Sequence, residues 1–230
     1  STGEVKAIVG GRGDKTASKT LNRATDTTRQ PGSTFKILAS YSAALDAGGL
    51  TLASVQDDAP YTYAGANGKS VSNYDKRYRG FTTLREAITD SINIVTVKTL
   101  AQVGVSLGWQ YVQEYGFTTV DSRDMNEALA LGGITQGVSN LELTAAYAAI
   151  ANQGTYIKPK FYTKILDHDG NVLIDNTTPE SHTVIKDTTA WLLTSAMEDV
   201  MTSGTGTSAY FGSSMAQAGK SGTTTSSRDA

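Results

Sequence analysis

The sequence contains no cysteine in 230 residues and only two histidines. The absence of cysteine excludes thiol catalysis, disulfide bonds and zinc–thiolate sites, and it suits a bacterial protein that works outside the cytoplasm. His168 lies in a polar turn and His182 just before an expected strand, which favours turn and surface roles over a Ser-His-Asp triad. Neither histidine belongs to a cluster with metal-ligand spacing, so we expect no metal and no other cofactor.

An excess of charge of either sign is also missing. Twenty basic and 22 acidic residues give a net charge of −2, which provides no electrostatic basis for binding nucleic acid. No apolar run approaches the roughly 18 residues that cross a bilayer, and Ser1 opens no signal peptide. A membrane tether would therefore lie outside this sequence. Apolar residues make up 39% and charged residues 18% of the chain, which is typical of a globular domain.

The chain is organised around residues 29–45. Pro31 and Gly32 predict a turn, and the positions after it have helical spacing on one face: Phe35, Leu38, Ser42 and Leu45. Ser33 is thereby placed at a helix N-terminus, where free N–H groups and the helix dipole favour developing negative charge. Lys36 follows three residues later on the same face. A lysine desolvated in a cleft can take the proton of a serine and make that serine a nucleophile.

By itself, Ser-x-x-Lys is more typical of a serine N-cap followed by a solvated lysine. Two further stretches change this interpretation. Ser91-Ile92-Asn93 occupies a turn between two expected helices, and Lys220-Ser221-Gly222 follows a Gly/Ser-rich turn. In this order the three motifs form the set used by penicillin-binding proteins and related β-lactamases.

The residues that flank these motifs strengthen the match. Residues 22–24 precede the Ser33 motif, and residues 137–139 lead into 145–148. Together they resemble the transpeptidase domain of a class A, bifunctional penicillin-binding protein, and the resemblance covers nearly the whole chain. It implies a serine D,D-transpeptidase that cross-links peptidoglycan stem peptides ending in D-Ala-D-Ala and is covalently acylated by β-lactam antibiotics. It also implies an extracytoplasmic location, with a membrane anchor and a glycosyltransferase domain in the full protein.

The resemblance implies a role for each motif residue. Ser91 relays a proton between Lys36 and the leaving nitrogen, and Asn93 binds the peptide portion of the substrate. Lys220 supplies a positive field beside the substrate carboxylate. That carboxylate is bound by Ser221 and Thr223, and the small Gly222 leaves room for the substrate. The oxyanion hole consists of the backbone N–H groups of Ser33 and Thr223.

The element pattern predicts an α+β fold in which a central antiparallel sheet formed by the chain ends is flanked by helices and carries an inserted helical subdomain. Strands are expected at residues 3–11 and around Lys220, and a hairpin at Asp169-Gly170. Helices are expected after the capping boxes Thr83–Glu86 and Ser139–Glu142, over residues 94–104 and 106–115, and after a cap at Asp187. Residues 51–80 read as an irregular surface excursion.

Two departures from the family pattern stand out. Ser221 replaces the commoner threonine but keeps the hydroxyl, so little change is expected. The family also has a first strand, and further strands with a terminal helix after the third motif, which this sequence lacks. We therefore expect residues 1–230 to be one transpeptidase domain truncated at both ends. Its incomplete sheet would be completed by strands from the remaining fragment of the same protein.

Several alternatives stay open at this stage. A serine β-lactamase would need a base for deacylation, but no Glu-x-x-Leu-Asn pattern occurs between Asn93 and Lys220, where Glu127 and Glu142 are the nearest candidates. A D,D-carboxypeptidase differs only in its acceptor, and a non-catalytic β-lactam sensor would keep the same serine and lysine. Residues 214–221 resemble a nucleotide-binding P-loop, but Ser214 replaces its first glycine.

Overall fold

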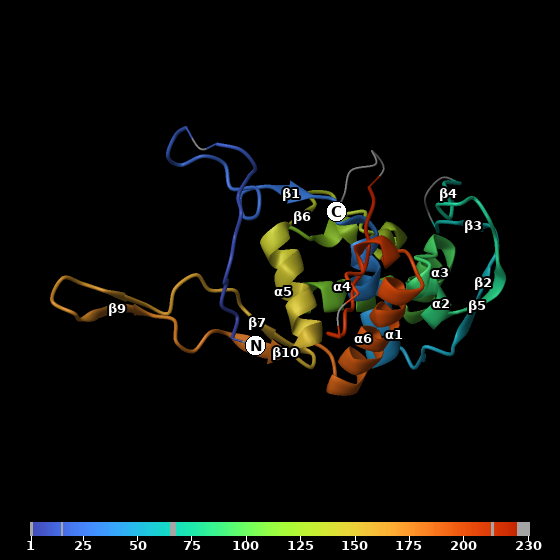
Figure 1. Ribbon diagram of the computed structural model, residues 1–230. Helices are drawn as coiled ribbons and strands as arrows, with labels where there is room; N and C mark the ends of the chain where they lie inside the picture. The colour runs from blue at the N-terminus through green and yellow to red at the C-terminus, as the bar shows by residue number, and fades with distance from the viewer. Residues whose placement is uncertain (1, 15, 65–67, 213, 225–230) are drawn as a thin grey trace.

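The helical segment that starts beside Ser33 runs through the centre of the molecule, as the blue ribbon in Figure 1 shows. The computed structural model describes residues 2–14, 16–64, 68–212 and 214–224. In it, a 3₁₀ turn η1 (Gly32–Thr34) leads into a π turn η2 (Ile37–Tyr41) and then into α1 (Ser42–Asp46). Phe35, Leu38 and Tyr41 are fully buried, and so are Lys36 and Ser40 between them. The predicted single apolar face is therefore wrong: a helix buried on all sides needs no polar face.

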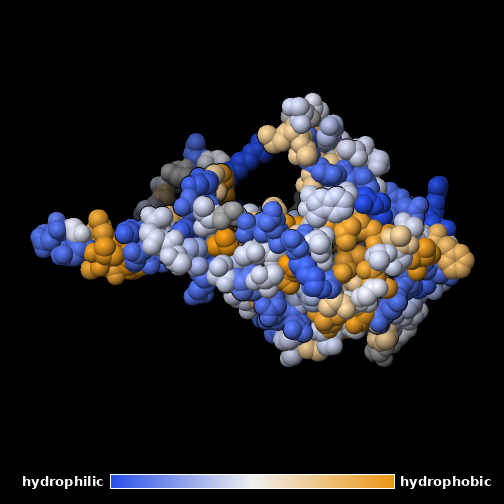
Figure 2. Space-filling model, turned by 90° about the horizontal axis from the view of Figure 1, so that it is seen from below, coloured by the Kyte–Doolittle hydropathy of each residue, from blue (hydrophilic) through white to orange (hydrophobic). Residues whose placement is uncertain are grey.

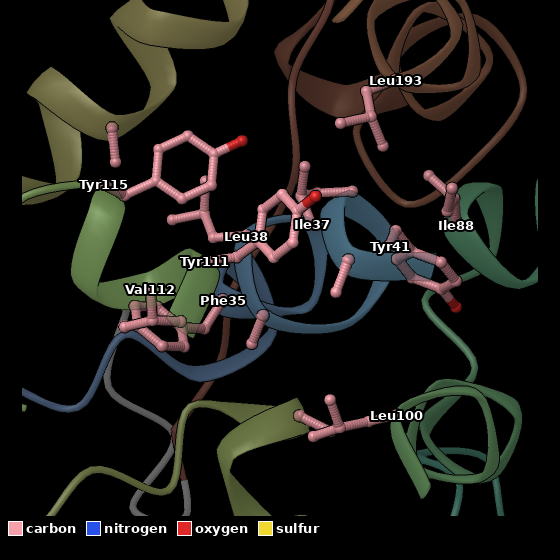
Figure 3. Close-up of a cluster of buried hydrophobic side chains, with 14 of the residues drawn as sticks. Phe35, Ile37, Leu38, Tyr41, Ile88, Leu100, Tyr111, Val112, Tyr115 and Leu193 are labelled. Carbon is pink, nitrogen blue, oxygen red and sulfur yellow. The ribbon is translucent and has the colours of Figure 1, made fainter. Parts of the chain in front are cut away.

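The other helices pack around this central segment. They are α2 (Leu84–Thr89), α3 (Asn93–Val103), α4 (Val105–Glu114), α5 (Asn140–Ala151) and α6 (Asp187–Thr202), with 3₁₀ turns η3 (Ser122–Asp124), η4 (Glu127–Leu131) and η5 (Thr207–Ala209). Figure 3 shows Phe35 and Leu38 of the central segment among side chains of the surrounding helices, such as Val112 and Leu193. The edge of the Phe117 ring packs against Phe35 with ring centroids 5.1 Å apart. The serine motif is thus anchored in the best-packed part of the protein.

The described strands form five two-stranded antiparallel sheets. The pairs are β1 (Thr28–Arg29) with β6 (Val138–Ser139), β2 (Val55–Asp58) with β5 (Gly80–Thr83), β3 (Tyr61–Thr62) with β4 (Ser70–Val71), β7 (Thr155–Ile157) with β10 (Ser181–Thr183), and β8 (Lys164–Leu166) with β9 (Val172–Asp175). The α+β class is confirmed, with a sheet that is incomplete in the described residues.

The two expected strands near the chain ends are not formed. Residues 3–11 contribute only a single parallel bridge, from Glu4 to Lys160, and residues 218–222 are extended without strand pairing. Alternating polar and apolar residues show that a segment suits a sheet, but a strand exists only where a neighbour supplies hydrogen bonds. Among the residues described here, the first segment finds only Lys160 as a strand neighbour, and residues 218–222 find none.

Most local signals predict the helix boundaries correctly. Thr83 and Ser139 form reciprocal capping boxes with Glu86 and Glu142, and α3 ends at Gly104, whose φ is 98°. The predicted cap at Asp187 is wrong by one residue. Lys186 is the N-cap and Asp187 is the first helical residue, where its carboxylate accepts the Thr188 N–H at 2.7 Å.

Residues 51–80 are more ordered than the sequence suggests. β2 lies near the start of this segment and pairs through four residue pairs with β5, which begins at Gly80. Asp58, the last residue of β2, and Asn73, between the two strands, are both buried. Tyr74 and Tyr78 are exposed, whereas Tyr61 is half-buried and donates to Glu127. The expected irregular excursion is therefore wrong, because the pairing of β2 with β5 spans some 25 residues and has no local signal.

The hairpin β8–β9 projects from the rest of the molecule (Figure 1) and turns at Asp169-Gly170 as predicted. Apolar side chains cover much of it, at the left of Figure 2, and Leu173 is 65% exposed. None of the helices in the described part of the chain is long and apolar enough to cross a membrane.

Candidate active site

The Ser33 corner is built by a turn that only glycine fits easily. Pro31 precedes the 3₁₀ turn as its N-cap, and Gly32 has a φ of 54°, a left-handed conformation that favours glycine. Ser33 is half-buried in the first turn, as predicted, where helical N–H groups lack intrahelical acceptors. The helix N-terminus therefore presents partial positive charge beside the Ser33 hydroxyl.

Lys36 is fully buried, and its amine is held by the second motif. Nζ donates to the Ser91 carbonyl at 2.7 Å, to Ser91 Oγ at 3.1 Å and to Asn93 Oδ1 at 2.6 Å. Among the described residues, Lys36 makes no hydrogen bond to Ser33. The predicted residues Lys36, Ser91 and Asn93 are thus brought together, with the lysine turned toward the second motif.

Burial is also the main influence on the charge of this lysine. Desolvation holds the pKa of Lys36 well below 10.5, and the nearby positive charge of Lys220 lowers this pKa further. The pKa of Lys220 is lowered to about 8, again by desolvation. Both shifts follow the rule that a low-dielectric setting disfavours the charged form of an amine. The neutral form of both amines is therefore favoured over that of an exposed lysine.

The second motif lies in the predicted turn between α2 and α3. Ser91 has a φ of 55°, a left-handed conformation uncommon for serine, which turns its carbonyl and its hydroxyl toward the lysine. The next residue continues the turn, with the Ile92 N–H donating to the Ala87 carbonyl at 2.9 Å. Asn93 is the first residue of α3, and its Nδ2 donates to the Ser72 carbonyl at 2.7 Å.

The third motif reaches the serine through backbone packing. A Cβ added to Gly32 would lie 2.8 Å from the Thr223 carbonyl oxygen, so the two main chains are in close contact. Ser221 Oγ and Thr205 Oγ1 share a hydrogen bond of 2.6 Å, and the Gly219 N–H donates to the Met197 carbonyl at 3.2 Å. Ser221 and Thr223 are exposed and Gly222 is half-buried. The structure therefore brings the predicted third motif beside Ser33, although as extended chain.

The Gly-rich loop after η4 packs on the other side of the same turn. A Cβ on Gly132 would lie 2.6 Å from the Gly32 carbonyl oxygen, so this contact too requires glycine. Gln30 secures the loop: its Oε1 accepts the Ile134 N–H at 3.0 Å, and its Nε2 donates to the Ile134 carbonyl. The turn that carries Ser33 is thus clamped between two backbone segments.

The glutamates and histidines considered for a β-lactamase or a Ser-His-Asp triad form contacts away from Ser33. Glu127 accepts from Tyr61 Oη and from the Ala64 N–H, both at 3.0 Å, and Glu142 caps α5 and binds Thr118. His168 is 90% exposed beside Asp169, and His182 contacts the Glu114 carbonyl at 2.7 Å. The predicted turn and surface roles of the histidines are confirmed, and neither glutamate bonds to Ser33.

The P-loop interpretation fails on geometry. A P-loop needs its lysine at the N-terminus of a helix whose N–H groups bind phosphate. In the described residues around Lys220, the chain is extended and Ser221 to Thr224 are not helical.

Sequence analysis missed Asn73 and Asp58, which support the second motif from behind. Asn73 Oδ1 accepts the N–H groups of Asn93 and Ile94, at 3.0 and 3.2 Å. A signal was present, because Ile92, the N-cap of α3, has no side chain that can accept a hydrogen bond. A helix that begins in this way needs its cap from elsewhere in the chain.

These positions bring a serine hydroxyl, a buried amine, a second hydroxyl and a helix N-terminus to one place, the groups that acyl transfer to serine requires. Comparison with known proteins agrees. The family model "Penicillin binding protein transpeptidase domain" matches residues 1–229. The chain belongs to this family.

Curated penicillin-binding proteins align with nearly the whole of this chain at moderate sequence identity. Penicillin-binding protein 1F of Bacillus subtilis is 40% identical over 223 residues, which cover 97% of this chain and 30% of that protein. Penicillin-binding protein 1A of Clostridium botulinum is 37% identical over 234 residues, 96% of this chain and 28% of that protein. The chain thus spans about 30% of the length of these curated relatives.

A solved structure supports the fold independently. The crystal structure of penicillin-binding protein 1A from Haemophilus influenzae superposes with a TM-score of 0.78 and 28% identity, covering 90% of this chain and 36% of that one. The small sheets and packed helices described above are therefore those of a transpeptidase domain.

Proposed function

We propose that this chain is a serine D,D-transpeptidase domain that joins peptidoglycan stem peptides. Ser33 Oγ attacks the carbonyl carbon of the penultimate D-Ala of a donor peptide, the terminal D-Ala leaves, and an ester on Ser33 remains. An amine of a second stem peptide then attacks this ester and takes over the acyl group. β-Lactams acylate the same serine. The observation that carries the proposal is the fully buried Lys36, bonded at once to Ser91 and Asn93.

Lys36 is suited to serve as the base. A neutral amine has two N–H groups and one lone pair, and three acceptor atoms surround Nζ. The Ser91 carbonyl and Asn93 Oδ1 can only accept, so they take the two N–H groups. When the amine is charged, Nζ donates to Ser91 Oγ as well; when it is neutral, this bond reverses and the hydroxyl donates to the lone pair. The lowered pKa of Lys36 favours this neutral form, and a movement of Nζ toward Ser33 would let it take the proton of the nucleophile.

The same contacts suggest the route of the proton to the leaving group. Ser91 Oγ is 3.1 Å from Lys36 Nζ, close enough to receive a proton from the lysine while passing its own to the departing nitrogen. No net proton is lost in this exchange. Ser91 is therefore assigned the relay, and Asn93, whose Nδ2 has one N–H besides that given to Ser72, binds the donor peptide.

The third motif completes the site on the other side of Ser33. Lys220, Ser221 and Thr223 are assigned the carboxylate of the donor peptide or of the β-lactam. The backbone N–H groups of Ser33 and Thr223 are assigned the oxyanion, which the contact between Gly32 and the Thr223 main chain supports. Loss of one such donor typically costs about 3–4 kcal/mol of transition-state stabilisation.

The fate of the acyl-enzyme distinguishes this function from its nearest alternatives. A class A β-lactamase uses a glutamate to activate water against the ester, but Glu127 and Glu142 are both committed to structural hydrogen bonds. This supports an ester that lasts until an amine arrives. A D,D-carboxypeptidase, which uses water as its acceptor, stays an alternative.

Membrane attachment and the origin of further strands are also proposals. The relatives named 1A and 1F are much longer than this chain, and we expect the anchor in such additional sequence. A groove of about 410 Å³ lies between residues 3–9 and the apolar residues of α5, including Leu141 and Ala145. Strands from the remaining fragment of the same protein would fit over this groove.

Intact-mass spectrometry after incubation with benzylpenicillin tests the proposed function. We expect a lasting adduct with the mass of the whole drug, mapped by peptide digestion to Ser33 and absent in Ser33→Ala. Rapid hydrolysis of the drug without an adduct would indicate a lactamase instead. A lasting adduct without turnover of a stem-peptide donor in the presence of an amine acceptor would indicate a sensor.

A further inference from the structure

The N-terminus of α3 is capped from a distance rather than by its own sequence. Ile92 occupies the N-cap position and has no side-chain acceptor. In its place, Asn73 Oδ1 accepts the N–H of Asn93 at 3.0 Å and that of Ile94 at 3.2 Å. Asn73 lies 20 residues before Asn93 and is only 2% exposed. One amide oxygen thus satisfies two of the four N–H groups that begin a helix.

A buried carboxylate fixes the orientation of this amide. Asn73 Nδ2 donates to both oxygens of Asp58, at 2.8 and 3.0 Å, and to the Arg77 carbonyl at 2.8 Å. Asp58 has no exposed surface, and it also accepts the Arg79 N–H at 2.9 Å. Because the carboxylate only accepts, Nδ2 must face Asp58 and Oδ1 must face α3.

One of the two capped residues, Asn93, also holds the lysine. Asn93 Oδ1 and Ser91 are the partners of Lys36 Nζ, and Asn93 is fixed at its N–H by Asn73 and at its Nδ2 by Ser72. A shift of Asn93 would therefore move one of the three atoms that orient the amine, and a shift of the whole Ser91–Asn93 turn would move all three. Such misplacements, even of about 1 Å, can slow catalysis about 100-fold.

We infer that Asp58 and Asn73 form a positioning pair that aligns the Ser91–Asn93 turn with Lys36 for acyl transfer at Ser33. The inference rests on the proposed function. Neither residue touches the substrate; both act through the first turn of α3. Asp58 is the last residue of β2 and has no exposed surface, and its Oδ2 lies 3.7 Å from Arg79 Nη1, which compensates its charge.

An exchange of the two side chains tests the pair. Asn73→Ala removes the cap, Asn73→Asp places two carboxylates face to face, and Asp58→Asn removes the fixed acceptor. In the double variant Asp58→Asn/Asn73→Asp, the new amide donates to the new carboxylate, which still caps α3 and suits a helix N-terminus. Recovery should be partial, because this variant loses the ion pair of Asp58 with Arg79 and places a carboxylate oxygen against the Arg77 carbonyl. We expect each single variant to lower the first-order rate constant of acylation by benzylpenicillin about 10- to 100-fold. The double variant should recover at least about fivefold over either exchanged single variant, as coupled pairs do.

Asp46→Asn provides a matched control. Asp46 also fixes a backbone N–H, that of Lys186 at 2.8 Å, and accepts from Tyr111 Oη at 2.7 Å. It lies at the far end of the central segment, in the last residue of α1. We expect a comparable loss of melting temperature in this variant without a change in the acylation rate constant. Equal slowing by Asp46→Asn, or unchanged acylation in Asn73→Ala, would overturn the inference and reduce the pair to a support for stability.

Amide hydrogen exchange separates this inference from the proposed function. In Asn73→Ala the N–H groups of Asn93 and Ile94 should exchange faster, whereas Asp46→Asn leaves them protected. Unchanged protection in Asn73→Ala would overturn the cap whatever the activity. A wild-type protein that forms no adduct on Ser33 would overturn the proposed function, while faster exchange in the variant would still support the cap.

Discussion

The two sides of the site differ in burial and in the hydrogen bonds that fix their side chains. On the side formed by Lys36, Ser91 and Asn93, the first two residues are buried and Asn93 is half-buried, and their polar atoms are joined by short hydrogen bonds. The side formed by Lys220 and the residues after it is extended chain, with Ser221 and Thr223 exposed. One side therefore sets the chemistry of the nucleophile through fixed geometry, whereas the other meets the substrate with groups that solvent reaches. Substitutions on the first side should act on rate, and those on the second on binding.

Of the variants proposed here, removal of the Lys36 amine should change the acylation rate most. Lys36→Ala should lower the acylation rate constant by about 100- to 10,000-fold, the contribution typical of a general base. The measurement is stopped-flow acylation with a chromogenic cephalosporin. Lys98→Ala is the control, because Lys98 on α3 donates to the Asp57 carbonyl and lies over Tyr61, away from Ser33. Acylation at the wild-type rate in Lys36→Ala would show that another group takes the proton.

The dependence of acylation on pH compares the two lysines directly. Lys36 must be neutral to act as a base, so acylation should fall as pH drops through its lowered pKa. Lys220 must be charged to attract a carboxylate, so acylation should also fall as pH rises above about 8. In Lys220→Ala the alkaline limb should disappear. The acidic limb should move to higher pH, because the loss of a nearby positive charge raises the pKa of Lys36.

Lys220→Arg is the matched variant for this profile. Arginine keeps its charge throughout the measured range, so the acidic limb should stay near its wild-type position while the alkaline limb disappears. An acidic limb at the same pH in Lys220→Ala as in the wild type would contradict an electrostatic link between the two amines.

The smallest effect is expected at the exposed side. Thr205→Val removes the 2.6 Å partner of Ser221 Oγ. A single hydrogen bond of this kind contributes about 0.5–1.5 kcal/mol, so the apparent affinity for a cephalosporin should fall by no more than about tenfold, with the rate constant of acylation unchanged. Thr202→Val, at the end of α6, serves as control, because it removes a hydroxyl that donates to the Glu198 carbonyl of the same helix. A fall in the rate constant instead would assign Thr205 to the alignment of the reacting groups.

Local signals made much of this molecule predictable. The capping boxes at Thr83 and Ser139 depend on residues three positions apart, and the turn at Asp169-Gly170 on adjacent ones. The three motifs could be recognised because each is short and their order is specific. Their convergence on one place follows from the family fold, and the structure adds the contacts that join Lys36 to Ser91 and Asn93.

Features that depend on distant partners could not be predicted. The alternation in residues 3–11 suggested a strand, but within the described part of the chain it forms a single bridge, from Glu4 to Lys160. Asp58 and Asn73 look like ordinary turn residues until the chain brings the amide of Asn73 to the start of α3. The π turn was likewise hidden, since the spacing of its apolar residues also fits an α-helix.

The π turn rotates the side-chain directions of the central segment about the helix axis. It fits an additional residue into one turn, so the residues after it are rotated by about 100° from where an uninterrupted α-helix would place them. Ser42 marks the junction: its hydroxyl donates to the Ile37 carbonyl at 2.9 Å and pairs with Tyr115 Oη at 2.9 Å. The residues before the π turn, which carry Ser33, and the residues after it are thereby oriented separately, although both pack into the core. The direction of the Ser33 turn is therefore not tied to the helical phase of α1.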